Sequence, residues 1–157
     1  MILATWAAAI LSLSPAAPPR ADPPSPPGDA DVTDLELRDL VSSRPLGPSP
    51  RARALAGRRV RLVGFMVDME DPPRGGFFLA ARPIRCDEEG AGTGDLPPDA
   101  VRVVLRDPPA EPFPFHPGWI EALGELEVGA DVDDEGRVSF FRVVVARPED
   151  LRALVLR

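Results

Sequence analysis

Apolar and polar residues alternate along most of the chain after Leu55, and this alternation predicts β-strands. Trp119–Val128 shows it most clearly, because residues of small or apolar type at even positions alternate with Glu121, Glu125 and Glu127. Turn-forming Gly and Pro residues separate the runs from one another. Five runs are expected to form strands: Arg58–Met69, Gly76–Arg82, Val101–Arg106, Trp119–Val128 and Val138–Ala146.

The lengths and order of these runs predict an all-β domain. Arg58–Met69 is long, apolar on both faces and carries a central glycine, Gly64, which suits a strand that bends and serves two sides of a small barrel. A long connection separates the third run from the fourth. We therefore expect a five-stranded OB-fold-like barrel, in which closure removes unpaired strand edges. A small β-sandwich is the alternative.

Short helices are expected at both ends of this domain. Asp31–Ser43 has capping-box spacing between Thr33 and Glu36, which predicts a short helix, with a strand at Leu35–Leu37 as the alternative. Residues 147–157 are expected to form a second short helix that covers one end of the barrel. Leu151, Leu154 and Val155 are expected to make this contact.

Asp131–Gly136 resembles the start of a calcium-binding loop. The twelfth position of such a loop needs a bidentate Glu, and here it is Arg142. The segment also lies between two predicted strands. We expect a hairpin turn in which Gly136 supplies a positive φ.

The N-terminus predicts export. An apolar run, Ile2–Leu13, is shorter than the roughly 20 residues that span a bilayer, and small residues suited to signal-peptidase cleavage follow it. We expect residues 1–17 to be a signal peptide, transiently in the membrane, and the mature protein to be periplasmic or extracellular. The run lacks a positive residue before Arg20, so an uncleaved anchor is the first alternative and a buried helix the second.

Residues 18–50 are expected to form a disordered, proline-rich tether with a short structured segment at 32–43, followed by the barrel domain at 51–157. "PPRADPPSPPGDAD" cannot bury apolar area and favours an extended polyproline II form.

Composition excludes one class of partner and leaves others open. The net charge is −7, which argues against nucleic acid because phosphate binding needs a positive field. A local basic run, Arg51–Arg61, contains no acid. It is expected either to dock an acidic partner or to pair with Glu121, Glu125 and Glu127 across the barrel.

One segment resembles a family of small exported bacterial proteins of unknown function. The resemblance begins in "LAGRRVRLVGFMVDME", Leu55–Glu70, with the pattern LxGxxVxxxGFMxxxE, and continues through "GFFLA", a cysteine, Pro97-Pro98 and "GELEVG". It implies an OB-like domain in the cell envelope and implies no reaction. The three acids that directly follow Cys86 depart from that family's loop.

Cys86 and the acids Asp87, Glu88 and Glu89 form the first candidate site. As the sole cysteine in an exported chain, Cys86 is a free thiol, a ligand or an intermolecular partner. One cysteine and adjacent acids do not supply the spacing of a zinc site. Neighbouring carboxylates also disfavour a thiolate, so a solvated acidic loop is the simpler interpretation.

"EPFPFHPGW" holds the second group of candidates. His116 is the only histidine. It is interpreted either as an ordinary loop residue or as a partner of Cys86, in a metal site or in a base–nucleophile pair. Phe113, Phe115 and Trp119 lie in or beside this proline-rich stretch, so we expect them to be more exposed than the strand phenylalanines and to form a small apolar patch.

Taken together, these patterns predict a non-enzymatic, exported binding module whose ligand is an envelope protein or another envelope component. Cys86, Asp87, Phe113, Phe115, His116 and Trp119 are the candidate binding residues. The alternative is a metal- or thiol-dependent activity that uses Cys86 and His116. The sequence shows no catalytic motif, and it leaves the metal and the cofactor undetermined.

Overall fold

The computed structural model describes residues 31–86, 96–133 and 136–154. This part of the chain is mostly β-strand, with a single short α-helix among the described residues, α1 (Pro50–Leu55), and two 3-10 turns, η2 (Leu37–Asp39) and η5 (Pro148–Asp150). The all-β class predicted from the alternation is therefore confirmed. The strands are β1 (Thr33–Asp34), β2 (Val41–Ser43), β3 (Leu46–Pro48), β4 (Arg59–Met66), β5 (Asp68–Met69), β6 (Gly76–Ala80), β7 (Arg85–Cys86), β8 (Val101–Leu105), β9 (Trp119–Val132), β10 (Val138–Val145) and β11 (Leu151–Leu154).

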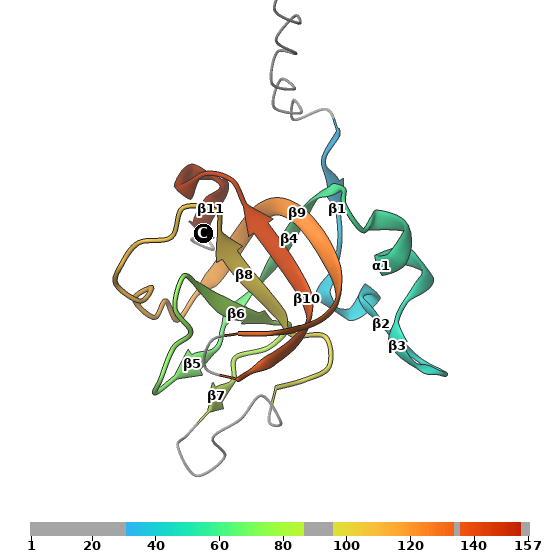
Figure 1. Ribbon diagram of the computed structural model, residues 1–157, viewed down its shortest axis with the longest axis horizontal. Coiled ribbons are helices and arrows are strands. Elements are labelled where there is room, and N and C mark those ends of the chain that lie inside the picture. The colour runs from blue at the N-terminus through green and yellow to red at the C-terminus, as the bar shows by residue number, and fades with distance from the viewer. Residues whose placement is uncertain (1–30, 87–95, 134–135, 155–157) are drawn as a thin grey trace, which may run out of the picture.

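The five predicted runs correspond to β4, β6, β8, β9 and β10, and each of these strands pairs with two others of the five. β4 pairs with β6 and β9, β8 pairs with β6 and β10, and β10 pairs with β9. The pairings therefore form a closed ring. The β8–β10 pair is parallel and the other four are antiparallel. In Figure 1 the long, curved β9 reaches from the β4 side of the ring to β10.

Strand alternation places one face of each ring strand in the core. In β4, Val60, Leu62 and Met66 are buried, whereas Arg61 and Val63 lie on the outer face and are half-buried. Similar alternation in the other strands fills the interior with branched and aromatic side chains. Fully buried members of this core are Leu62, Leu79, Val101, Val103, Leu126, Phe141, Val143 and Val145.

Gly64 marks a close approach in β4. A Cβ at this position would lie 2.7 Å from Leu37 Cδ1 and 2.9 Å from the Ala80 carbonyl oxygen. Only a residue without a side chain leaves room for both neighbours. The central glycine noted in the sequence therefore lets the N-terminal segment and β6 meet the same strand.

The helix predicted at Asp31–Ser43 is wrong. β1 pairs in parallel with β4, a 3-10 turn follows, and β2 and β3 form a small hairpin. Leu35, Leu37 and Leu40 are buried in the main core, so this segment is part of the folded body. The edge of β4 offers hydrogen bonds that an isolated short helix cannot match, and Leu35 N–H donates to the Arg61 carbonyl at 3.0 Å.

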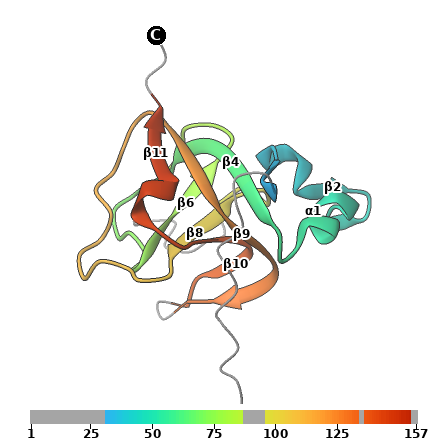
Figure 2. The ribbon, with the colours of Figure 1, turned by 90° about the horizontal axis from the view of Figure 1, so that it is seen from above.

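The helix predicted at 147–157 is also wrong within the described residues. The chain makes one 3-10 turn at η5 and then continues as β11, which pairs antiparallel with the start of β9. Leu151 packs against the core, as expected, but from a strand. Figure 2 shows β11 on one side of the molecule, with α1 and β2 on the opposite side.

The hairpin predicted at Asp131–Gly136 is confirmed, because β9 and β10 are antiparallel neighbours and Gly136 has a φ of 81°. No helix in the described ranges is both long and apolar enough to cross a membrane. The predicted signal peptide and the first part of the predicted tether lie outside the described residues.

Candidate ligand-binding groove

A groove of about 660 Å³ runs between the N-terminal segment and the outer face of β4. One wall is the chain from β1 to η2 with a contribution from α1, and the other side is formed by β4, the residue after β6 and the start of β9. Its lining combines apolar and charged residues. Its lining residues are Asp34, Leu35, Glu36, Leu37, Arg38, Asp39, Arg51, Arg61, Val63, Ala81 and Trp119.

Trp119 gives the groove its aromatic surface. It is the first residue of β9 and lies opposite Phe65 of β4 in the strand register. The two rings are 4.1 Å apart with an interplanar angle of 37°, so Phe65 supports one side of the indole. The indole is half-buried and offers both an apolar surface and an N–H donor to a ligand.

Charged side chains also line the groove, and most of the ion pairs that they form are exposed. Arg61 lies 3.2 Å from a carboxylate oxygen of Asp34 and 3.6 Å from one of Glu121. Arg51 lies 3.7 Å from Asp39 and donates to the Asp34 backbone carbonyl at 3.0 Å. Exposed pairs of this kind contribute little to stability, so a charged ligand can compete for them.

The basic run was predicted to pair with Glu121, Glu125 and Glu127, and the Arg61–Glu121 ion pair matches this prediction. Arg59 instead pairs with the buried Asp150 at 3.3 Å, and Glu127 pairs with Arg142. Arg59 and Asp150 join β4 to the turn before β11, which fixes the C-terminal strand against the ring.

The three aromatic candidates differ in their surroundings and in their exposure. Phe113 packs edge-on against Phe77, with ring centroids 5.3 Å apart, and is half-buried against the main core. Phe115 is 47% exposed, as expected for a loop residue. Trp119 is half-buried and lines the groove, so Phe115 is the one fully exposed member of the three. Phe140 is one of the strand phenylalanines, which were expected to be less exposed than the loop aromatics, and it is 52% exposed.

His116 lies in the connection between β8 and β9 and is half-buried. Its ring rests on Gly118, where a Cβ would approach Nε2 to 2.9 Å. The imidazole therefore occupies the space that a side chain at position 118 would need.

Cys86 lies in β7, opposite Met69 of β5 in a parallel pair. It is half-buried and packs against a small satellite core around Phe78. Asp87, Glu88 and Glu89 lie outside the described residues. Among residues 31–86, 96–133 and 136–154, no three His, Cys, Asp or Glu side chains gather in a metal-binding group.

The metal- or thiol-dependent alternative at Cys86 and His116 therefore stays a prediction. It predicts that the purified chain carries a divalent metal that Cys86→Ser loses. Elemental analysis of both proteins checks it. Equal background content in the two would remove the metal form of the hypothesis.

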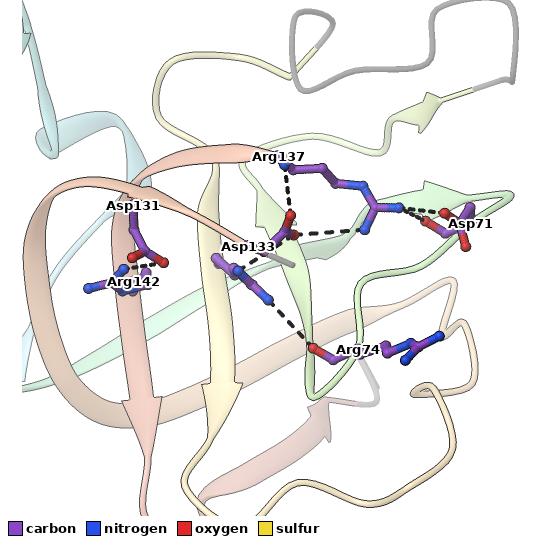
Figure 3. A network of polar contacts seen from close by, with 7 residues as sticks. Asp71, Arg74, Asp131, Asp133, Arg137 and Arg142 are labelled. Carbon is purple, nitrogen blue, oxygen red and sulfur yellow. Dashed lines mark hydrogen bonds and ion pairs between the residues drawn. The ribbon is translucent and has the colours of Figure 1, made fainter. Parts of the chain in front are cut away.

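A second polar cluster lies away from the groove, where the β9–β10 turn meets the connection between β4 and β6 (Figure 3). The Asp133 side chain is 1% exposed and lies 3.5 Å from Arg102 of β8 and 3.8 Å from Arg137. Arg137 also donates to the Asp71 carboxylate at 2.7 Å, and Figure 3 shows its guanidinium between the two acids. The cluster thus ties β8 and two connections together.

Arg142 holds the neighbouring Asp131 and Glu127 on the outer face of β9. The hydrogen bond from Arg142 holds the pKa of the Asp131 carboxyl below its ordinary value. Burial alone lowers the pKa of the Arg142 guanidinium, but the hydrogen bonds that it donates to Asp131 and Glu127 outweigh this effect, so the pKa is raised. Asp131 and Arg142 therefore both stay charged near neutral pH.

Sequence reasoning did not find Arg102, Asp133 or Arg137. Arg102 alternates with core residues in β8, and that pattern predicts exposure to solvent, whereas its side chain is only 10% exposed. Its acid partner comes from a turn that lies far along the chain. The sequence offered one signal for this cluster, which was the acidic turn at Asp131–Gly136 together with an arginine, Arg102, inside an otherwise apolar strand.

A search against protein-family models and a search of curated proteins each found no match. Among solved structures, the chain is similar to a DUF3299 family protein from Pseudomonas aeruginosa PAO1. The two share 16% sequence identity and a TM-score of 0.45, and the match covers 79% of this chain and 97% of that one.

Proposed function

We propose that this protein is an exported, non-enzymatic binding module of the bacterial cell envelope, built on an OB-fold-like barrel, and that its ligand occupies the Trp119 groove. The groove is the single observation that carries the proposal. It combines about 660 Å³ of space, a supported indole and several exposed charges on one side of the ring. Such concave sites with an apolar surface and a few polar groups are typical of ligand binding.

The OB-fold-like assignment is supported by the order of the ring strands. Counting only the five ring strands along the chain, the first pairs with the second and fourth, and the third runs parallel to the fifth. The first strand is long and serves two neighbours, as the central glycine suggests. OB folds are five-stranded Greek-key barrels that bind their ligands on one outer face and on the adjoining loops.

The envelope location is supported by the sequence at the N-terminus. An apolar run too short to span a bilayer precedes small residues and then a proline-rich stretch. A net charge of −7 suits a protein that does not bind anionic surfaces or nucleic acid.

Affinity capture from envelope extract tests this function. The immobilised protein is compared with Trp119→Ala and with Phe115→Ala, which removes an exposed aromatic outside the groove. We expect the wild type and Phe115→Ala to retain the same component and Trp119→Ala to lose it. Circular dichroism verifies that each variant is folded. Identical capture by all three proteins would contradict the assignment of ligand binding to the groove.

A further inference from the structure

The backbone of Val63 lies at a gap in the strand pairing of β4. β1 pairs with β4 as far as Arg61, and β6 pairs with it from Phe65 onward. β1 ends at Asp34 and β6 ends at Ala80, and the residues that follow each of them are no longer paired with β4 as a strand. One short stretch of strand edge, centred on Val63, therefore lies between the two strand ends.

Strand alternation decides where the peptide groups of Val63 point. The Arg61 carbonyl accepts a hydrogen bond from Leu35 N–H at 3.0 Å, so the peptide groups of Arg61 face the β1 side and not β9. Residues two positions apart in an antiparallel strand direct their peptide groups to the same edge. The N–H and C=O of Val63 therefore face the gap, and no described residue hydrogen-bonds to either of them.

The gap opens into the groove already described. Val63 lines that groove, together with Leu35 after β1 and Ala81 after β6. Trp119 lines it as well. A ligand in the groove thus meets an unpaired donor and acceptor on a strand edge and an aromatic surface at the same time.

We propose that the groove binds an extended peptide segment, one residue of which pairs with Val63 while a neighbouring side chain packs on Trp119. This inference rests on the proposed binding function and adds the class of ligand. The N–H and C=O of Val63 are spaced as in any strand residue, so they match the C=O and N–H of one residue in an extended peptide. Addition of an extended peptide to a free strand edge is a known mode of recognition.

The charges of the groove favour a peptide over a neutral glycan. Both guanidinium and carboxylate groups line it, in Arg38, Arg51 and Arg61 and in Asp34, Glu36 and Asp39. These groups form exposed pairs with one another, and charged side chains of a peptide can replace one partner of such a pair. A neutral sugar offers no charge for this exchange.

The test uses the full chain with Trp6→Phe, because Trp119 is then the only tryptophan and the chain contains no tyrosine. Linear peptides are selected from a displayed random library, with counter-selection on Trp119→Ala, and are then titrated while Trp119 fluorescence is recorded. A scan of single N-methyl groups along a selected peptide follows. We expect one or two adjacent positions to weaken binding about tenfold, as loss of one backbone hydrogen bond does.

Val63→Pro provides the complementary variant. It removes the N–H that faces the gap, where no described residue uses it, so the fold has little to lose. Val63→Thr keeps the N–H and the branched shape and is the matched control. We expect about tenfold weaker peptide binding for Val63→Pro and nearly unchanged binding for Val63→Thr. Thermal unfolding of both variants reports on folding, and the N-methyl scan stands if Val63→Pro does not fold.

Three results would overturn the inference. They are failure to select any peptide, an N-methyl scan without a sensitive position, and equal binding by Val63→Pro and Val63→Thr. N-acetylated sugar oligomers and fractionated envelope extract are titrated in parallel. If either of these changes Trp119 fluorescence while peptides do not, the proposed function survives and the peptide inference fails. If no probe has any effect, both fail.

Discussion

Arg142 sets the charge of Asp131 through a direct hydrogen bond, so the pKa of Asp131 lies below its ordinary value. Because this pKa is lower in the folded state than in the unfolded chain, the pair stabilises the fold above the unfolded value of about 3.9. That contribution is lost as the pH falls through the folded value. An NMR titration of the Asp131 carboxyl carbon should show the low midpoint.

Arg142→Met should return the midpoint of Asp131 to its ordinary range, because it removes the donor and keeps the aliphatic stem. Asp34, whose arginine partner is a different residue, is the internal control in the same spectra. An Asp131 midpoint that does not move in Arg142→Met would show that another group lowers it.

Asp133 carries the larger expected effect on stability, because its side chain is 1% exposed and two arginines face it. Asp133→Asn keeps the shape and removes the charge, which leaves Arg102 buried beside a neutral group. We expect a loss of about 3 kcal/mol in the free energy of unfolding. Arg38 pairs with Glu36, and its side chain is 75% exposed. Arg38→Ala should therefore change the free energy of unfolding by less than about 1 kcal/mol.

Urea denaturation of these two variants and the wild type measures both effects. Similar small losses in Asp133→Asn and Arg38→Ala would mean that the buried cluster is not a significant source of stability.

At this scale the sequence predicted some positions and not others. Phe115 is exposed and Trp119 is accessible, as their proline-rich surroundings indicate. Phe113 is held against Phe77 by a contact between segments distant in the sequence, which no local pattern reveals. The partnership of Arg102 with Asp133 was hidden for the same reason.

Among the elements, the N-terminal segment depends on Leu37. This residue is 3% exposed, packs in the main core and touches Gly64 of β4. Leu37→Ala should lower the free energy of unfolding by about 3 kcal/mol, since it leaves a cavity that the short segment cannot fill. It should also speed hydrogen exchange at the Leu35 amide, which bonds to Arg61.

Leu46→Ala is the matched control, because Leu46 lies in the same segment and is 74% exposed. It should leave both the unfolding free energy and the Leu35 exchange rate nearly unchanged. Unaltered Leu35 exchange in Leu37→Ala would show that β1 is held by its backbone pairing alone.

Local patterns were sufficient to predict the five ring strands. β4 and β10 alternate between the core and the outer face, and β6 and β8 are short runs that are buried almost throughout. These patterns failed for Thr33–Leu40 and for Leu151–Leu154, where short leucine-containing segments suit a helix turn and a strand equally. The edges of β4 and β9 decide between these two forms. Availability of an edge is a property of the assembled sheet and cannot be read from the segment itself.

In the whole molecule, closure of the ring explains why the groove forms where it does. One edge of β4 pairs with β9 from Arg59 to Phe65, and its other edge is shared between β1 and β6. Between the end of β1 and the end of β6, the edge of β4 at Val63 is left unpaired by the described residues and lines the groove. The predicted absence of nucleic-acid binding belongs to this scale too, and it stays a prediction that rests on the net charge of −7.

Mapping of ligand contacts by amide and indole NMR signals tests the binding account most directly. In the full chain with Trp6→Phe, Trp119 gives the single indole N–H signal. On addition of the envelope component captured by the protein, we predict shifts of this signal and of the Val63 amide, with unchanged signals from Arg102 and Phe140 on the opposite strands. Shifts confined to β8 and the β9–β10 hairpin, with the Trp119 signal unmoved, would contradict it.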